Sequence, residues 1–167
     1  MTAALQKKMC MLGGFSVGKT SLVRRFVHSV FSDAYLTTVG VKIDKKIVDL
    51  ADRTINLILW DLAGEDDLAS LRITYLRGAS GYLLVADGTR RSTLDVALSL
   101  NQRVEKEFGP LPFALLLNKS DLKEQWAISD ADLASLHQNG WWVRSTSALT
   151  GDGVEDAFRD LAIRVAG

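Results

Sequence analysis

The sequence predicts an α/β fold with a doubly wound, mostly parallel six-stranded sheet, one antiparallel edge strand and about five helices. Three observations predict it. Apolar runs of strand length alternate with helix-like stretches, one alternating segment has the pattern of a hairpin, and a glycine-rich segment follows the first apolar run. No repeat, low-complexity stretch or linker divides residues 1–167, so we expect a single domain.

The predicted strands are short and almost continuously apolar, which is typical of parallel strands buried on both faces. They cover residues 8–12, 54–60, 81–86, 113–117 and 141–143. Residues 41–50 instead alternate apolar and polar side chains, and only Ala51, Asp52 and Arg53 separate them from the next strand. This segment is therefore predicted to form an antiparallel edge strand, on which Lys42, Lys45 and Lys46 would discourage further strand pairing.

Helix-like patterns occupy the intervals between these strands, at residues 19–28, 67–76, 93–108, 130–138 and 154–165. Crossover helices connect parallel strands, so the carboxyl ends of the strands share one edge of the sheet. Ligands bind at that edge in open α/β sheets.

The composition limits the classes of partner. With 20 basic and 20 acidic residues the formal net charge is zero, so nucleic acid is not expected as the main partner. The single cysteine, Cys10, lies in an apolar run and is predicted to be a core thiol, in keeping with a reducing compartment. We expect a cytoplasmic protein because the sequence has neither a signal peptide nor an apolar stretch of about 18 residues.

A phosphate-binding loop is the strongest motif. The segment after the first strand fits Gly, four residues, Gly, Lys, Ser or Thr, and it opens a helix, which is the context of the P-loop NTPases. Backbone N–H groups and the helix N-terminus would surround the phosphates, Lys19 would add a charge, and the Thr20 hydroxyl would bind Mg²⁺. The residues predicted to contact nucleotide here are Gly14, Phe15, Ser16, Val17, Gly18, Lys19, Thr20 and Ser21.

The segment Asn118-Lys119-Ser120-Asp121 indicates which nucleotide is bound. It follows a buried strand, and the Asp121 carboxylate can accept two hydrogen bonds from the ring and amino N–H groups of guanine, whereas adenine offers no such pair. A site built around such hydrogen bonds rejects the wrong base strongly. Without the phosphate loop, the four residues would be equally consistent with a surface turn.

On these motifs the chain resembles the Ras superfamily of small GTPases, and the Rab branch is nearest. The resemblance covers nearly the whole length. Its Rab-like segments are Thr38-Val39-Gly40-Val41, Trp60-Asp61-Leu62-Ala63-Gly64 and Tyr75-Leu76-Arg77-Gly78-Ala79. It implies a monomeric switch that binds GTP or GDP with Mg²⁺ and presents its switch segments to effectors, exchange factors and GTPase-activating proteins.

The resemblance also assigns roles to individual residues. Thr20, Thr38 and Asp61 would hold Mg²⁺, and Gly64 would sense the terminal phosphate and, with Lys19 and Glu65, take part in hydrolysis. Phe31 would cover the guanine ring and Tyr35 would close over the phosphates, although both also suit hydrophobic loop anchors. The last guanine-contact loop would be Ser147, Ala148 and Leu149, where leucine replaces the lysine often found in the family.

Two positions depart from the family in ways that affect hydrolysis. Glu65 stands where most relatives have the glutamine that orients the attacking water, and Phe15 stands where many have glycine or a small residue. An ionised glutamate accepts hydrogen bonds but cannot donate them. Phe15 lies near the place where an activating protein's arginine would enter. We therefore expect slow hydrolysis and little stimulation by a Ras-type activator.

Two alternatives stay open beside this hypothesis. A guanine-nucleotide-binding scaffold with negligible hydrolysis is consistent with Phe15 and Glu65. An ATP-dependent kinase or ATPase accounts for the phosphate loop but leaves residues 118–121 and 146–148 without a purpose. Many Rab relatives end in prenylated cysteines and this chain does not, so either a tail was removed or peripheral membrane association has another basis.

Overall fold

The computed structural model describes residues 5–28, 41–62 and 73–166. Its described strands form one six-stranded sheet in the order β2-β3-β1-β4-β5-β6. All neighbouring strands are parallel except the antiparallel pair β2 and β3, which confirms the predicted sheet. The strands are β1 (Leu5–Gly13), β2 (Val41–Asp49), β3 (Thr54–Leu62), β4 (Gly81–Asp87), β5 (Phe113–Asn118) and β6 (Val143–Ser145).

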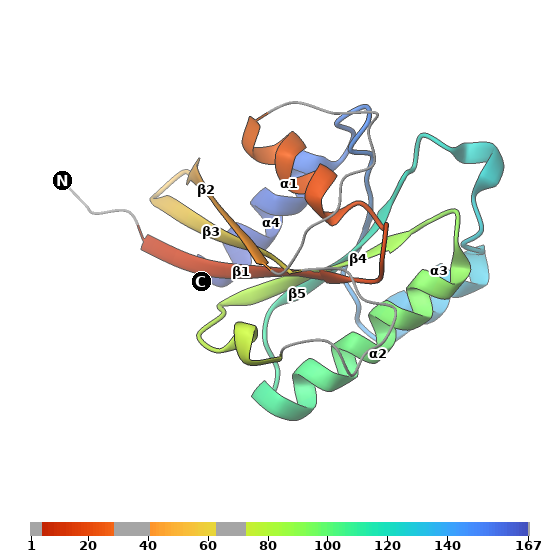
Figure 1. Cartoon of the computed structure of the whole chain (residues 1–167), viewed down its shortest axis with the longest axis horizontal. Coiled ribbons are helices and arrows are strands. Elements are labelled where there is room, and N and C mark those ends of the chain that lie inside the picture. The colour runs from red at the N-terminus through yellow and green to blue at the C-terminus, as the bar shows by residue number, and fades with distance from the viewer. Residues whose placement is uncertain (1–4, 29–40, 63–72, 167) are drawn as a thin grey trace.

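Helices cover both faces of this sheet. Figure 1 shows α1 and α4 on one side, and α2 and α3 on the other. The described α-helices are α1 (Lys19–His28), α2 (Arg91–Phe108), α3 (Asp130–Gln138) and α4 (Val154–Ala166), with short 3-10 helices η2 (Ile73–Leu76) and η3 (Lys123–Gln125). Of the helix predicted at 67–76, only the last turn is described, and it is the 3-10 helix η2. No helix in the described ranges is long and apolar enough to cross a membrane.

Two hydrophobic cores lie on opposite faces of the sheet. On the side of α1 and α4, the rings of Phe26 and Phe158 stack with centroids 4.2 Å apart. On the side of α2, Tyr82 stacks on Phe113, and its hydroxyl accepts a hydrogen bond of 2.8 Å from the Asn101 side chain. Cys10 belongs to this second core, where burial raises the pKa of its thiol to about 12. The prediction of an unreactive core thiol is thus supported by its surroundings.

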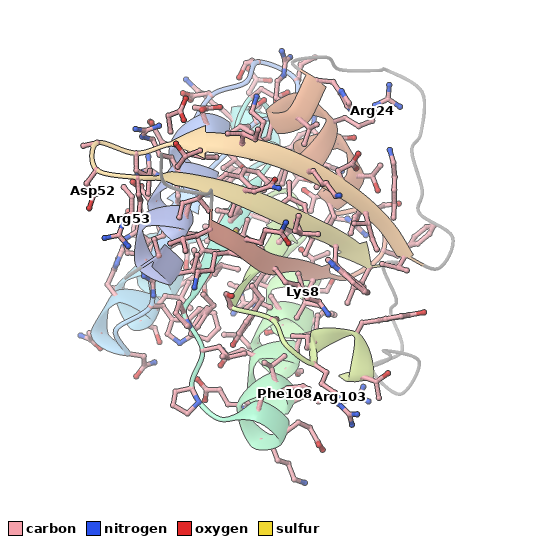
Figure 2. The ribbon with its side chains drawn as sticks, turned by 90° about the vertical axis from the view of Figure 1, so that its left-hand side faces the viewer. Lys8, Arg24, Asp52, Arg53, Arg103 and Phe108 are labelled. Carbon is pink, nitrogen blue, oxygen red and sulfur yellow. The ribbon has the colours of Figure 1, made fainter. Side chains whose placement is uncertain are left out.

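The predicted hairpin is confirmed at one edge of the sheet. Strands β2 and β3 pair over their full length, and the Leu50 N–H donates to the carbonyl oxygen of Arg53 across the turn. Figure 2 shows Asp52 and Arg53 at this turn, at one end of the hairpin. Because β2 is antiparallel to β3, the hairpin makes the sheet mixed rather than purely parallel, and among the described strands β2 lies at the edge.

The sixth strand is shifted from its predicted position. Residues 141–143 were expected, whereas β6 covers Val143–Ser145. Trp141 instead completes the end of α3, since its N–H donates to Leu136 and the Gly140 N–H donates to His137. This is the hydrogen-bond pattern of a Schellman motif, with Gly140 at φ 78°. Trp141 and Trp142 pack against different cores, since Trp141 contacts the core on the side of α2 and Trp142 the core on the side of α1 and α4.

Candidate functional site

The predicted motifs meet at the carboxyl edge of the sheet. Strand β1 leads into the phosphate loop. Strand β3 ends at Asp61 and Leu62, and strand β5 ends at Asn118. Two side-chain contacts join these strand ends. Thr20 Oγ1 lies 2.6 Å from Asp61 Oδ2, and Asn118 Nδ2 donates to the Val17 carbonyl oxygen at 3.0 Å. The two residues of the first contact are 41 positions apart in the sequence and those of the second are 101 apart, so distant segments form one site.

The phosphate loop connects β1 to α1 with an unusual backbone. Ser16 has φ 61° and Gly18 has φ 100°, both in the left-handed region. A Cβ atom on Gly18 would lie 2.3 Å from Asn118 Nδ2, so only glycine fits beside that side chain. Gly14 and Val17 are buried, Ser16 is half-buried, and Ser21 continues the first turn of α1. The Phe15 side chain is 43% exposed on the loop.

Lys19 lies against the inside of this loop. Its side chain is only 6% exposed, and its amino group donates to the carbonyl oxygens of Gly13 at 3.3 Å and Gly14 at 3.4 Å. A buried ammonium at the N-terminus of a helix adds its charge to that of the helix dipole. The loop therefore carries the positive potential that a phosphate group needs.

Thr20 and Asp61 fit a magnesium site. Asp61 is 1% exposed, and its carboxylate accepts the short hydrogen bond from the Thr20 hydroxyl described above. Mg²⁺ takes hard oxygen ligands and is bound in nucleotide enzymes by one or two protein groups together with phosphate and water. A hydroxyl and a carboxylate side by side next to the phosphate loop supply that donor set. The third predicted ligand, Thr38, lies outside the described residues.

Asn118 connects the phosphate loop to the last predicted guanine-contact loop. Its amide nitrogen donates to Val17, and its amide oxygen accepts from the Thr146 hydroxyl at 3.2 Å. Both Asn118 and Thr146 are buried, at 2% and 0% exposure. The Ser120 N–H also donates to the Thr146 carbonyl oxygen. One buried amide thus fixes three segments of the site relative to one another.

Lys119 also contacts the phosphate loop. Its amino group donates to the Ser16 carbonyl oxygen at 3.2 Å and forms an ion pair of 2.9 Å with Asp87 at the end of β4. Burial of Asp87 raises the pKa of its carboxyl, but hydrogen bonds from Thr89, Lys119 and Arg90 outweigh burial, and the pKa stays below its ordinary value. Asp87 is therefore an ionised carboxylate at neutral pH.

Asp121 and Ser147 bring the two predicted guanine-contact segments together. The Ser147 hydroxyl donates to Asp121 Oδ1 at 2.7 Å and accepts from the Thr150 N–H at 3.1 Å. Ser147 and Ala148 are buried, whereas Leu149 is 46% exposed. The hydrogen bonds orient the carboxylate of Asp121 against the loop that follows β6. This is the arrangement expected if a carboxylate and backbone N–H groups contact the same base.

Five predicted site residues cannot be placed, because they lie in the ranges 29–40 and 63–72 outside the described part of the chain. They are Phe31, Tyr35, Thr38, Gly64 and Glu65. Their roles stay predictions from the resemblance. The described residues include the phosphate loop with Lys19, two of the three residues predicted to hold Mg²⁺, and the segments 118–121 and 147–149 predicted to contact guanine.

Three further residues contact this site although no motif singled them out. Asp87 pairs with Lys119, Arg90 donates to the Phe15 carbonyl oxygen, and Arg25 donates to the Ala148 carbonyl oxygen. Asp87 had a signal in the sequence, since a polar residue directly follows the apolar run 81–86 at the carboxyl edge. Neither arginine had one, because a cation in a helix or loop is most often a solvated surface residue.

The chain is similar to known proteins over most of its length. A family model described as the Ras family matches residues 8–166. Ras-related protein Rab-4 of Dictyostelium discoideum is 35% identical over 153 residues, which cover 90% of this chain and 75% of the relative. Ras-related protein Rab-32 of Mus musculus is 34% identical over 92% of this chain and 73% of the relative. Ras-related protein Rab5 of Nicotiana tabacum is 34% identical over 96% and 82%, respectively.

Proposed function

The chain belongs to the Ras family and is a Rab-like small GTPase, and from this premise we propose that it is a switch that binds GTP and GDP with Mg²⁺ and hydrolyses GTP slowly. One observation supports the proposal most strongly. The buried amide of Asn118 contacts both the phosphate loop at Val17 and the Thr146 segment beside the base site. A ligand that spans this amide needs phosphates at one end and a base at the other.

Guanine is the base that the polar groups favour. The Ser147 hydroxyl donates to the Asp121 carboxylate, so this carboxylate and the backbone of the Ser147 and Ala148 loop lie side by side, where both would contact one edge of the same base. Guanine offers N–H donors to the carboxylate and a carbonyl oxygen to the N–H groups. Adenine would not offer the Asp121 carboxylate this pair of N–H donors, at a cost of about 1–3 kcal/mol for each group left unpaired.

The residues around the phosphates would position the substrate by charge and hydrogen bonding. Lys19 would contact the terminal phosphates, and the loop N–H groups would surround them. Thr20 and Asp61, with Thr38, would hold Mg²⁺, which when bound neutralises charge on the phosphates. The switch segments around Thr38 and Gly64 would be ordered by the terminal phosphate and read by effectors.

Slow hydrolysis is proposed on the basis of Phe15 and Glu65. The exposed side chain of Phe15 projects from the phosphate loop where an activator's arginine would insert, a group worth about 10³ to 10⁵ in rate. Glu65 would accept a hydrogen bond from the attacking water but could not donate to the transition state. A scaffold with negligible turnover is the second candidate, and the exposure of Phe15 is the observation that favours it.

Nucleotide identity is tested first. Purified protein is denatured, and the released nucleotide is compared by chromatography with GDP, GTP and ATP standards. Guanine nucleotide is expected, and stoichiometric ADP or ATP would refute the proposal.

Turnover is tested next by single-turnover phosphate release with and without Mg²⁺. We compare the wild type with Glu65→Gln and Phe15→Gly, and we measure GDP exchange on the same samples. Slow but measurable release supports the switch, no release in the wild type supports the scaffold, and fast release by the wild type would contradict both. Matching GDP exchange rates across the three proteins would show that the variants still bind nucleotide.

A further inference from the structure

The carbonyl groups of the phosphate loop all accept hydrogen bonds from side chains. Five consecutive carbonyl oxygens, 13–17, accept hydrogen bonds from side chains: Lys19 to Gly13 and Gly14, Arg90 to Phe15, Lys119 to Ser16, and Asn118 to Val17. In a planar trans peptide the C=O and the following N–H point in opposite directions. A donor that fixes one of these carbonyls therefore also fixes the N–H of the next residue, which points away from that donor.

Of these donors, Arg90 is the one outside every predicted motif. It precedes α2, and its Nη2 lies 2.8 Å from the Phe15 carbonyl oxygen, 75 positions earlier in the chain. The peptide that it contacts ends in the N–H of Ser16. Ser16 has φ 61°, a left-handed conformation that costs conformational free energy in a residue other than glycine. Arg90 and Lys119 contact the carbonyls on either side of Ser16, so together they stabilise this conformation.

A buried carboxylate fixes both of these cations. Arg90 Nε lies 3.0 Å, and Lys119 Nζ 2.9 Å, from the same Oδ2 atom of Asp87. The other oxygen of Asp87 accepts from the N–H and hydroxyl of Thr89. The Asp87 side chain is only 2% exposed, so the Arg90 guanidinium is held by a buried carboxylate and is not a free surface group. Its fork geometry lets one nitrogen pair with Asp87 while another donates to Phe15.

We infer that Arg90 is a positioning residue of the phosphate loop, which holds the peptide between Phe15 and Ser16 in the orientation that binds the second phosphate of GDP and GTP. The inference rests on the proposed guanine-nucleotide binding and adds a residue to it. Arg90 acts through the loop backbone and does not contact the base. Its loss therefore weakens binding of a diphosphate and leaves binding of the base and the first phosphate unchanged.

The experiment compares affinities for GDP and GMP in Arg90→Ala, Arg90→Lys and wild type, by competition against a fluorescent GDP analogue. Arg91→Ala is the matched control, since Arg91 pairs with Asp95 and Asp132 and not with the loop. Loss of a charge-assisted hydrogen bond is expected to weaken GDP binding about tenfold in Arg90→Ala, with GMP affinity unchanged. Arg91→Ala is expected to match the wild type for both nucleotides.

The variant Arg90→Lys distinguishes the geometry of the Arg90 contacts from the positive charge of the side chain. An ammonium on a single stem does not form both contacts at once, so Arg90→Lys is expected to bind GDP nearly as weakly as Arg90→Ala, and it serves alone if the alanine variant does not fold. Full recovery by lysine, an equal loss for GDP and GMP, or unchanged GDP affinity would each overturn the inference. If the wild type itself binds no GDP, the proposed function fails. If it binds GDP and Arg90→Ala binds it equally well, only the role of Arg90 fails.

Discussion

The guanidinium of Arg25 in α1 donates from Nε to the carbonyl oxygen of Ala148 at 2.8 Å, although 123 positions separate the two residues. A second nitrogen of the same side chain, Nη2, donates to the carbonyl oxygen of Leu149. Helix α1 begins at the phosphate loop, and residues 147–149 form the last predicted guanine-contact loop. One side chain thus fixes the base end of the site to the helix that starts at its phosphate end.

Replacing Arg25 should speed nucleotide release. In Arg25→Ala the loop loses two hydrogen bonds to its carbonyls, so GDP dissociation should be about tenfold faster, as expected for loss of a charge-assisted contact. Stopped-flow displacement of a fluorescent GDP analogue measures the rate. Arg24→Ala, on the same helix, is the control and should release GDP at the wild-type rate. An unchanged rate in Arg25→Ala would show that the loop keeps its position without this arginine.

Alanine at Gly18 should disrupt the site. The substitution places a Cβ 2.3 Å from the buried Asn118 amide at a residue with φ +100°. The amide would have to leave Val17 or Thr146, which adds about 1–3 kcal/mol to the backbone strain of about 1–2 kcal/mol. Gly78→Ala is a matched control, because Gly78 has φ +79° with nothing within 4 Å of its Cβ position. Thermal unfolding and bound-GDP content should separate the two variants, with GDP lost only in Gly18→Ala.

The stability contributed by Asp87 should depend on pH below about 4, the ordinary range for aspartate. Its pKa is lower in the folded state than in the unfolded chain, so the unfolded state binds the proton first as pH falls. The contribution is complete above the unfolded pKa and is lost as pH falls through the folded one. Asp87→Asn should lower the free energy of unfolding by about 2 kcal/mol near neutral pH. Urea unfolding from pH 7 to pH 3 should show this difference shrinking, and a difference that grows on acidification would contradict the assignment.

The stacked pair Phe26 and Phe158 should be a main source of stability. Phe158 is 0% exposed beneath α1, and removal of a buried phenylalanine typically costs about 3–5 kcal/mol. Phe158→Ala should therefore unfold at much lower urea concentration. Ile163→Ala, a substitution of a half-exposed residue on the same helix, should cost less than about 1 kcal/mol. Similar midpoints for the two variants would show that the stacked rings contribute little.

Local patterns predicted most of the sheet because its strands are chemically distinct from their connections. The alternation of 41–50 revealed the β2 hairpin, and continuous apolar runs revealed the buried parallel strands. The error at β6 arose because tryptophan is common in strands, so Trp141 and Trp142 suggested that the strand begins there. In the structure Gly140 allows the turn in which the Trp141 N–H caps the end of α3. A hydrogen bond between Trp141 and Leu136 decided the boundary, and no apolar pattern contains that information.

The candidate site was predictable where a motif is contiguous in sequence and hidden where contacts are long-range. In residues 13–20 and 118–121, the order of the residues alone predicts which groups contact phosphate and guanine. The contacts of Arg25 and Arg90 depend on where α1, β6 and β4 lie in the folded sheet. An isolated arginine gives no sign of which carbonyl it will reach. Long-range side-chain to backbone bonds are therefore the part of the site that required a structure.

The position of β1 between β3 and β4 has a consequence for folding during synthesis. β1 leaves the ribosome first, yet one of its two partners, Gly81–Asp87, lies about half the chain later. The β2 hairpin has only a short turn to close, so its loop-closure entropy is small, whereas the pairing of β1 with β4 must close a long loop. We expect the hairpin to form early, and the segment Gly13 to Thr20 to acquire its left-handed turn only after β4 has been made.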